Sequence, residues 1–366
     1  MKTKTTKTTT ALEVPETTIG IDLGERNHAV CAMDAAGEFV EERKIANNRD
    51  ALSKLSKAYP GARIVMEVGS HSPWISRLFE KLGHEVFVAN PRKLRAIYEN
   101  ERKCDQLDAQ ILARVGRLDP KLLYPIAHQS EQAQRDLLQI KLRDNLVRQR
   151  VDIISSVRFT LKSLGVKISS SKTSYFPKRA REQLTEEHGE LLKMIEPSLQ
   201  VIDEMTKRIK ELDKRIEQLG IEEYPESLRL QQIRGIGPIT ALTFLLTIGD
   251  PKRFAKSRDV GAYLGLVPKR DQSGESDKQL RISKAGDGLP APAPQSASQY
   301  MLGPFGEDCD LRRHGLELAK RGGRSAKKKA VVAIARKLSV IMHTLWSNQS
   351  DYKALRNLKV EVEEAA

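Results

Sequence analysis

The sequence predicts an α/β layer domain, then a long helical arm, then a mainly α-helical C-terminal domain. Short apolar runs alternate with amphipathic stretches from residue 18 to about 120, which is the pattern of an α/β layer fold. The next hundred residues are highly charged and have helical spacing. The expected parts are a disordered tail at 1–17, the α/β domain at 18–125, the arm at 126–228, the C-terminal domain at 229–348 and a second tail at 349–366.

The α/β domain is expected to resemble the ribonuclease H type of fold. Three closely spaced strands with a turn at Ala35-Ala36-Gly37 precede a strand–helix alternation. In that fold, acids at strand ends and on a late helix meet at one edge of the sheet. The expected strands are Thr18–Asp22, His28–Met33, Phe39–Ile45, Ile64–Glu67 and Val86–Ala89, and the expected helices are Asp50–Tyr59, Pro73–Leu82, Lys93–Glu101 and Gln106–Gly116.

Four carboxylates occupy the positions that such an edge would bring together. Asp22 ends the first expected strand and Glu67 ends the fourth, while Asp105 and Asp108 begin a helix three residues apart, on one face. Acids in this arrangement can hold two divalent ions about 4 Å apart, which clamp the attacking and leaving oxygens of a phosphodiester. We therefore expect a site for Mg²⁺, or Mn²⁺, although each acid alone would be read as an ordinary solvated side chain.

The composition favours nucleic acid as the partner. The 366 residues include 62 Lys and Arg against 48 Asp and Glu, a formal net charge of +14. No apolar run is long enough to span a bilayer and no signal peptide is recognisable, so no membrane partner is expected. The scattered cysteines Cys31, Cys104 and Cys309 fit a reducing cytoplasm, with Cys104 expected to be a small buried residue.

The arm is expected to consist of two antiparallel helices. The first runs roughly from 132 to 164 and is followed by a Ser- and Lys-rich loop at 165–177. The second carries an apolar seam with heptad spacing, interrupted upstream by Pro197. The arm could be a purely intramolecular hairpin or could also pair with another subunit. The seam residues are Ile202, Met205, Ile209, Leu212, Ile216 and Leu219.

Two stretches of the C-terminal domain are expected to contact phosphates. The first, 233–248, resembles a helix–hairpin–helix element, in which glycines and a helix N-terminus offer backbone N–H groups to a phosphate. The second, 311–337, carries ten Lys or Arg against one acid on an apolar-faced helical element, where a solvated face is the alternative. The candidate contacts are Arg234, Gly235, Gly237, Arg312, Arg313, Arg321, Arg324, Lys327, Lys328 and Lys329.

Eight short motifs follow one another along nearly the whole chain. They are Ile19-Gly20-Ile21-Asp22, Met66-Glu67-Val68-Gly69, the segment 103–109 around Asp105 and Asp108, Gly235-Ile236-Gly237, the segment 261–268, Gln272-Ser273-Gly274, the segment 302–306 and Arg321-Gly322-Gly323. In order and spacing, these motifs resemble those of the transposases of insertion-sequence family one-ten, in particular its eleven-eleven group.

This resemblance implies a fold, a chemistry and a set of partners. It implies a RuvC-like domain with Asp-Glu-Asp-Asp chemistry and magnesium, in a bacterial, cytoplasmic, nucleoid-associated recombinase. Such an enzyme excises and inserts its own mobile element, acting on the element ends and the target DNA. It is guided by an RNA encoded in the element, and it works as a dimer or tetramer. A family serine that forms a transient phosphoserine link to DNA matches Ser273.

The residues around Ser273 allow a plainer interpretation as well. Ser273 lies in the polar run 270–279, where a turn is the default expectation. Lys269, Arg270 and Lys278 could hold a phosphate beside it. No base is adjacent to the serine in sequence, so activation would have to come from the metal-binding domain.

The sequence departs from the family pattern at 289–298, where prolines stand at positions 290, 292 and 294. Each costs about 3 kcal/mol in a helix interior, so we expect no helix through Pro290–Pro294. The interruption puts the activity of this copy in doubt. Two alternatives therefore remain open: a Holliday-junction-type nuclease that uses water and the four carboxylates, and a catalytically inactive nucleic-acid-binding relic.

Overall fold

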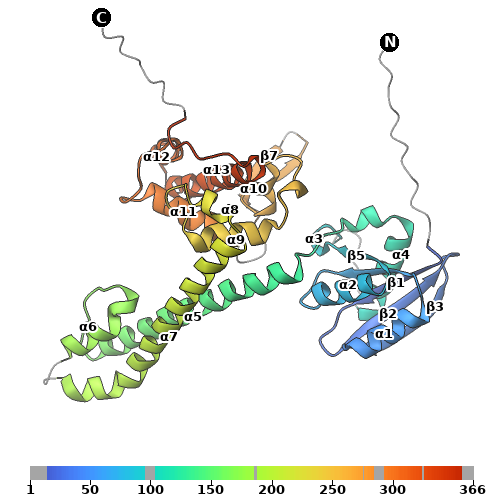
Figure 1. The fold of residues 1–366 in the computed structure, drawn as a ribbon, viewed down its shortest axis with the longest axis horizontal. Helices are drawn as coiled ribbons and strands as arrows, with labels where there is room; N and C mark the ends of the chain where they lie inside the picture. The colour runs from blue at the N-terminus through green and yellow to red at the C-terminus, as the bar shows by residue number, and fades with distance from the viewer. Residues whose placement is uncertain are drawn as a thin grey trace, which may run out of the picture. The chain divides into compact units, whose positions relative to one another are not determined.

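The computed structural model describes residues 15–94, 104–184, 188–274, 276–283, 292–323 and 325–356. The chain divides into two compact units, 1–129 and 130–366 (Figure 1). Each unit has its own buried hydrophobic clusters. The helical arm and the C-terminal domain belong to the same unit.

The first unit is a five-stranded sheet with helices on both faces, as the sequence predicts. The strand order is β3-β2-β1-β4-β5, with β2 antiparallel to both neighbours and β4 parallel to β1 and β5. All five predicted strands are confirmed, with ends that differ by one residue or less. The strands are β1 (Thr17–Asp22), β2 (Asn27–Asp34), β3 (Phe39–Ala46), β4 (Arg63–Glu67) and β5 (Glu85–Ala89).

Helices α1 (Arg49–Ala58) and α2 (Ser72–Lys81) cover one face of this sheet, and α4 (Asp105–Leu118) lies on the other. These three helices confirm the prediction. Of the helix expected at 93–101, the structure describes only a first part as α3 (Pro91–Leu94), because 95–103 lie outside the described residues.

The arm consists of two long antiparallel helices of one chain, α5 (Glu131–Ser163) and α7 (Gly189–Glu222). Nε of Arg143 on α5 lies 2.8 Å from Oδ1 of Asp213 on α7. Further along, Arg150 donates to the Oγ1 atom of Thr206 at 3.1 Å. From the first pair to the second, the residue number rises on α5, from 143 to 150, and falls on α7, from 213 to 206. The two helices are therefore antiparallel, as expected.

Two details of the arm differ from the prediction. Helix α7 continues through Pro197, because this proline is exposed and water can satisfy the carbonyl that it leaves without a donor. Arg181 further supports this turn by binding Glu196 at 2.7 Å. The expected loop at 165–177 ends early, since η2 (Thr173–Tyr175) leads directly into α6 (Phe176–Gln183), whose Phe176 is fully buried.

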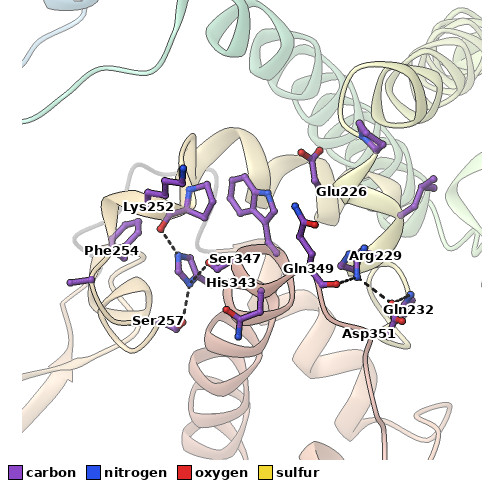
Figure 2. Close-up of a pocket in the computed structure, with 16 residues that line it drawn as sticks. Glu226, Arg229, Gln232, Lys252, Phe254, Ser257, His343, Ser347, Gln349 and Asp351 are labelled. Atoms are coloured by element: carbon purple, nitrogen blue, oxygen red, sulfur yellow. Dashed lines mark hydrogen bonds and ion pairs between the residues drawn. The ribbon is translucent and has the colours of Figure 1, made fainter.

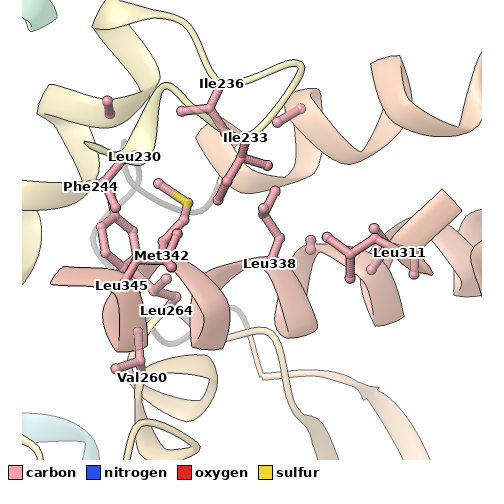
Figure 3. Close-up of a cluster of buried hydrophobic side chains, with 14 of the residues drawn as sticks. Leu230, Ile233, Ile236, Phe244, Val260, Leu264, Leu311, Leu338, Met342 and Leu345 are labelled. Carbon is pink, nitrogen blue, oxygen red and sulfur yellow. The ribbon is translucent and has the colours of Figure 1, made fainter. Parts of the chain in front are cut away.

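The C-terminal part of the second unit is mainly helical and is built around α13 (Ala326–Asn348). Figure 3 shows Leu338, Met342 and Leu345 of this helix inside the hydrophobic core. The surrounding elements are α8 (Glu226–Leu230), α9 (Pro238–Ile248), η4 (Pro251–Arg253), α10 (Asp259–Tyr263), α11 (Pro292–Leu302) and α12 (Asp310–Lys320). The hairpin of β6 (Pro268–Ser273) and β7 (Ser276–Ile282) was not expected in this domain.

The prediction for the proline-rich segment is wrong at its C-terminal end. Helix α11 begins at Pro292 and includes Pro294, whereas 284–291 lie outside the described residues. The first turn of a helix has no carbonyl partners for its N–H groups, so prolines there lose no hydrogen bond. The segment that the prolines were expected to break is therefore helical from Pro292 onward.

The expected tail after 348 is also partly wrong. In the described residues after α13, the Tyr352 N–H donates to Oε1 of Gln232 at 2.9 Å. The Ala354 carbonyl accepts from the N–H of Asp310, also at 2.9 Å. Residues 349–356 therefore pack on the second unit, and 357–366 lie outside the described residues.

Helix α13 is long and apolar enough to span a bilayer by length and composition, which corrects the expectation that the chain contains no such segment. However, Ala330, Ile334 and Leu338 are fully or almost fully buried in the protein core. Its first turn carries three lysines. The burial of these residues identifies α13 as the central helix of a packed domain.

Candidate active site

Two of the four predicted acids end neighbouring parallel strands. Strands β1 and β4 pair from Thr18–Arg63 through Ile21–Met66, so the next positions, Asp22 and Glu67, stand side by side at the ends of the strands. Both residues are partly buried. The central strands of the sheet thus bring these two carboxylates to one edge.

Helix α4 reaches the same edge because two glycines allow it to lie very close to the sheet. A β-carbon on Gly20 would lie 2.0 Å from the carbonyl oxygen of Ala109, and one on Gly116 would lie 2.3 Å from a methyl carbon of Val65. No side chain fits between the backbones of β1 and α4 at Gly20. The motif around Asp22 therefore includes a glycine whose role is to admit the helix.

The first turn of α4 lies at the end of β1 that carries Asp22. The helix begins at Asp105, and the amide of Gln106 donates to the carbonyl oxygen of Val30 at 3.3 Å. Val30 is the cross-strand partner of Ile21, directly before Asp22. Asp105 and Asp108, which flank Gln106 on this turn, therefore start at the edge where Asp22 and Glu67 end their strands.

The backbone thus brings the elements that carry the four acids together, but it does not make a finished metal cluster. Within the described residues, no three side chains of His, Cys, Asp or Glu are gathered in an arrangement that could hold an ion. Carboxylates repel one another unless protons or a cation balance their charge. The ligand chemistry fits a hard cation such as Mg²⁺, since all the donors are carboxylate oxygens. The shared metal site stays a prediction.

The loops that follow the two strand-end acids are joined to each other, a feature that the sequence reasoning missed. Nε2 of His71 lies 3.2 Å from Oε2 of Glu25. Glu25 comes three residues after Asp22, and His71 comes four residues after Glu67. The only signal in the sequence was their position just beyond each acid, and that position does not reveal that the two loops meet.

Each of these loops is also anchored to its own surroundings. The Asn47 amide donates to the backbone carbonyl of Glu25 at 2.9 Å. In the other loop, the Ser72 hydroxyl donates to the Gly69 carbonyl at 2.9 Å and lies 3.0 Å from Nε2 of His128. The backbone beyond the two acids is therefore held by side chains from two further segments of the first unit, around Asn47 and around His128.

Cys104, next to Asp105, corrects another expectation. Its side chain is exposed, whereas Cys31 and Cys309 are buried. Cys104 is the N-cap of α4, and a residue just outside a helix that begins at the sheet edge has little packing around it.

The serine candidate lies in the second unit, at the tip of the β6–β7 hairpin. Ser273 is the last residue of β6 and pairs with Ser276 across the turn, where Gly274 has a φ of +56°. A positive φ at this position is what a two-residue hairpin turn requires, so glycine follows the serine for a conformational reason. The turn expected from the polar run is present, and it closes a hairpin.

One of the predicted phosphate contacts near Ser273 already has a partner. Arg270 forms a two-point ion pair with Asp277, with distances of 2.8 and 2.7 Å, and its guanidinium lowers the pKa of that carboxyl. Lys269 is exposed. The side chains of Ser273 and Lys278 lie outside the described part of the structure.

The glycine turn at 235–237, before α9, is in contact with the segment that contains Tyr300 and Glu307. Gly235 has a φ of +90°, and a β-carbon there would lie 2.8 Å from the Tyr300 ring. Arg234 pairs with Glu307 at 3.1 Å, while Gly237 is the N-cap of α9. A glycine turn therefore precedes α9, while the helix–hairpin–helix element and its binding of phosphate stay predictions.

The candidate phosphate contacts within 311–337 fall into two groups. Arg312 donates to the carbonyls of Met301 and Gly303, and Arg313 pairs with Asp308, so both have structural partners. The second group is exposed and has no acidic partner among the described residues. It comprises Arg321, Lys327, Lys328 and Lys329; Arg324 lies outside the described residues.

The mixed five-stranded sheet with helices on both faces is consistent with a RuvC-like α/β domain. Residues 19–165 match the DEDD transposase model of the IS110 type, and residues 227–289 match a second one, described as "Transposase IS116/IS110/IS902 family". The two matches together cover more than half of the chain. The protein belongs to the IS110 family of insertion-sequence transposases.

Named relatives agree with this assignment. The chain is 24% identical over 339 residues to the transposase for insertion sequence element IS1111A of Coxiella burnetii. The aligned region covers 92% of this chain and 91% of the relative. It is 27% identical over 285 residues to the transposase for insertion sequence element IS1328 of Yersinia enterocolitica, covering 74% and 79%. The similarity to the IS1111A transposase, which extends over nearly the full length of this chain, is consistent with the expected relation to the eleven-eleven group.

Proposed function

We propose that this transposase cleaves and exchanges DNA strands by using the carboxylate edge of the first unit together with Ser273 of the second, guided by an RNA of its element. The observation that carries the proposal is the placement of Asp22 and Glu67 at the ends of neighbouring parallel strands, with the first turn of α4 at the same edge. Membership of the transposase family supports a DNA substrate.

The chemistry assigned to the first unit is activation of a phosphodiester. Asp22, Glu67, Asp105 and Asp108 are the residues that would hold Mg²⁺ or Mn²⁺, and a bound ion would supply positive charge beside the scissile phosphate. The bridge between Glu25 and His71 keeps the two loops beyond the strand ends together. The pairing of β1 with β4 fixes the separation of the strand ends that carry Asp22 and Glu67.

The chemistry assigned to the second unit is transfer of the phosphoryl group to a serine. The Ser273 hydroxyl loses its proton as its oxygen bonds to phosphorus, and the bond from phosphorus to one deoxyribose oxygen breaks. That oxygen takes up a proton and becomes a free hydroxyl. A hydroxyl of the exchanged strand later attacks the phosphoserine and regenerates Ser273, so the bond energy is conserved and no nucleotide cofactor is consumed.

The position of Ser273 at a hairpin tip supports this role, because a residue beside a tight turn can approach a duplex without a neighbouring strand in the way. Guidance by RNA rests on the family resemblance and on the net charge of +14, which favours a polyanion. Assembly into a dimer or tetramer rests on the resemblance alone.

The test uses end-labelled target DNA, the element's structured RNA and magnesium, followed by denaturing electrophoresis. The full chain should retain label covalently, whereas Ser273→Ala and Asp22→Ala should not. Ser276→Ala, the cross-strand partner of Ser273, is the matched control and should retain label. Cleavage that survives in Ser273→Ala without any labelled protein would indicate the water-using junction nuclease. Nucleic-acid binding without cleavage in any variant would indicate the inactive relic.

A further inference from the structure

The second unit contains a cavity that none of the functions above uses. It has a volume of about 790 Å³ and lies between α8, the segment 251–257 and the C-terminal end of α13 with the residues after it (Figure 2). This volume is in the range of small-molecule sites, roughly 300–1,000 Å³.

Aromatic and proline side chains form the apolar part of the lining. Trp346 and Phe254 line the cavity while also packing against the hydrophobic core, and Pro225 and Pro251 add apolar surface. The ring of Phe254 has edge contacts with the rings of Tyr263 at 5.4 Å and His343 at 5.7 Å. These contacts hold the ring of Phe254 in place before any ligand arrives.

Hydrogen bonds fix the walls in the same way. His343 is buried, with Nε2 at 3.0 Å from the Pro251 carbonyl and Nδ1 at 3.0 Å from the Ser257 hydroxyl (Figure 2). On the opposite side, Arg229 donates to the Gln349 carbonyl and lies 3.3 Å from Asp351. A preformed cavity costs little ordering entropy on binding.

One border of the cavity is strongly basic. The segment 251–258 carries Lys252, Arg253, Lys256 and Arg258, all exposed, and contains no acid. Lys252 also lines the cavity itself. Among the described residues, no carboxylate pairs with Lys252, Lys256 or Arg258. The lining also includes two acids, Glu226 and Asp351, of which Asp351 pairs with Arg229. The positive charge without a carboxylate partner therefore lies on the Lys252 side of the cavity, beside Phe254.

We propose that this cavity binds an unstacked nucleobase of single-stranded nucleic acid, with the base on Trp346 and its phosphate at Lys252. A flat ring with a neighbouring phosphate is the ligand that matches an aromatic wall next to a cationic border. Stacking on an aromatic side chain accepts any base, because every base has a π-face. DNA and RNA share this chemistry, and an enzyme that exchanges strands must handle unpaired ones.

Tryptophan fluorescence tests the proposal directly, because the chain has two tryptophans, Trp74 and Trp346. In a full-length Trp74→Phe protein, Trp346 is the sole reporter. Single-stranded DNA and RNA oligonucleotides of one sequence should quench its emission saturably, and the stronger of the two identifies the natural strand. An abasic strand of equal length and charge, and the matching duplex, should not quench it.

Affinity measurements complete the test. Trp346→Ala should bind the single strand about 5- to 150-fold more weakly, the equivalent of one stacked base, and Trp346→Phe should keep most of the affinity. Lys252→Ala should weaken binding and reduce its salt dependence, whereas Lys207→Ala on the exposed side of α7 is the matched control. Thermal melting of each variant separates lost binding from lost folding, since Trp346 also contacts the core.

The outcomes decide between this site and the function proposed above. Equal quenching by the abasic strand, or tight binding of single strands without any change in Trp346 emission, would overturn the nucleobase site. Either result would leave the strand-exchange chemistry untouched. Failure to bind any nucleic acid, duplex included, would instead contradict both proposals.

Discussion

Gly20 and Ala109 face each other with no room for a side chain between them. A β-carbon on Gly20 would lie 2.0 Å from the Ala109 carbonyl oxygen and 2.6 Å from the N atom of Ala113. Gly20 comes two residues before Asp22, and Ala109 directly follows Asp108. The contact therefore ties together the strand and the helix that carry three of the four predicted metal ligands.

Gly20→Ala should push α4 away from the sheet. We expect a loss of roughly 1–3 kcal/mol in the stability of the first unit, as for overpacked cores, and loss of magnesium-dependent cleavage. The measurement is urea unfolding followed by Trp74 fluorescence in a Trp346→Phe background, so that only the first unit is reported. Gly69→Ala, in the same unit and with open space and no positive φ, is the control and should leave the stability nearly unchanged. Unchanged stability in Gly20→Ala would mean that the helix can shift freely.

The first unit should lose stability in mild acid because of His28. This side chain is buried, with Nε2 at 3.1 Å from Oδ1 of Asn47, and burial lowers its pKa below the ordinary 6.5; the nearby His71 contributes to the lowering. Below pH 6.5 the unfolded chain therefore binds a proton that the folded unit does not. Stability should fall as the pH drops from 6.5 toward the lowered pKa, by up to about 1.4 kcal/mol per pH unit.

Urea unfolding at a series of pH values between 7.5 and 5.5 checks this expectation. His28→Asn removes the proton-binding group, so its stability should be lower throughout but less dependent on pH than that of the wild type. His71 is present in both proteins, which leaves His28 as the difference between them. Parallel pH curves for the two proteins would show that His28 does not cause the acid sensitivity.

The three lysines at the start of α13 should destabilise the helix and strengthen the binding of duplex nucleic acid. Lys327, Lys328 and Lys329 stand in the first turn, where the helix dipole is positive and no acid is present. Replacing all three with Ala should therefore stabilise the helix, by roughly 0.3–1 kcal/mol per residue. The same change should flatten the salt dependence of duplex binding by up to about three phosphate equivalents, near 0.9 log unit each.

A matched triple variant separates these lysines from surface charge in general. Lys207, Lys210 and Lys214 are exposed on α7, where acids such as Glu204, Glu211 and Glu217 alternate with them. Their replacement with Ala should leave the salt slope nearly unchanged. Equal slopes for both triple variants would mean that the lysines of α13 only solvate the helix.

Local sequence pattern was sufficient for most elements of the first unit. Apolar runs such as Ile64–Met66 act within a few residues of themselves, so periodicity locates the strands and helices. The same locality explains the failures. Pro197 and Pro292 were expected to interrupt helices. Pro292 stands in the first turn of α11, where no hydrogen bond is lost, whereas Pro197 is exposed and water can satisfy the carbonyl that it leaves without a donor.

The features of the candidate sites also fall into two kinds, those set by local sequence and those set by tertiary packing. The sequence by itself determined that four acids stand at strand ends and at a helix start, and that Ser273 precedes a glycine turn. Only the tertiary structure decided that Gln106 holds the first turn of α4 at Val30, and that Glu25 meets His71. It alone brought Trp346 and Lys252 to one cavity, over 94 residues of sequence. Which polar groups meet is set by the packing of distant segments, and no local spacing encodes it.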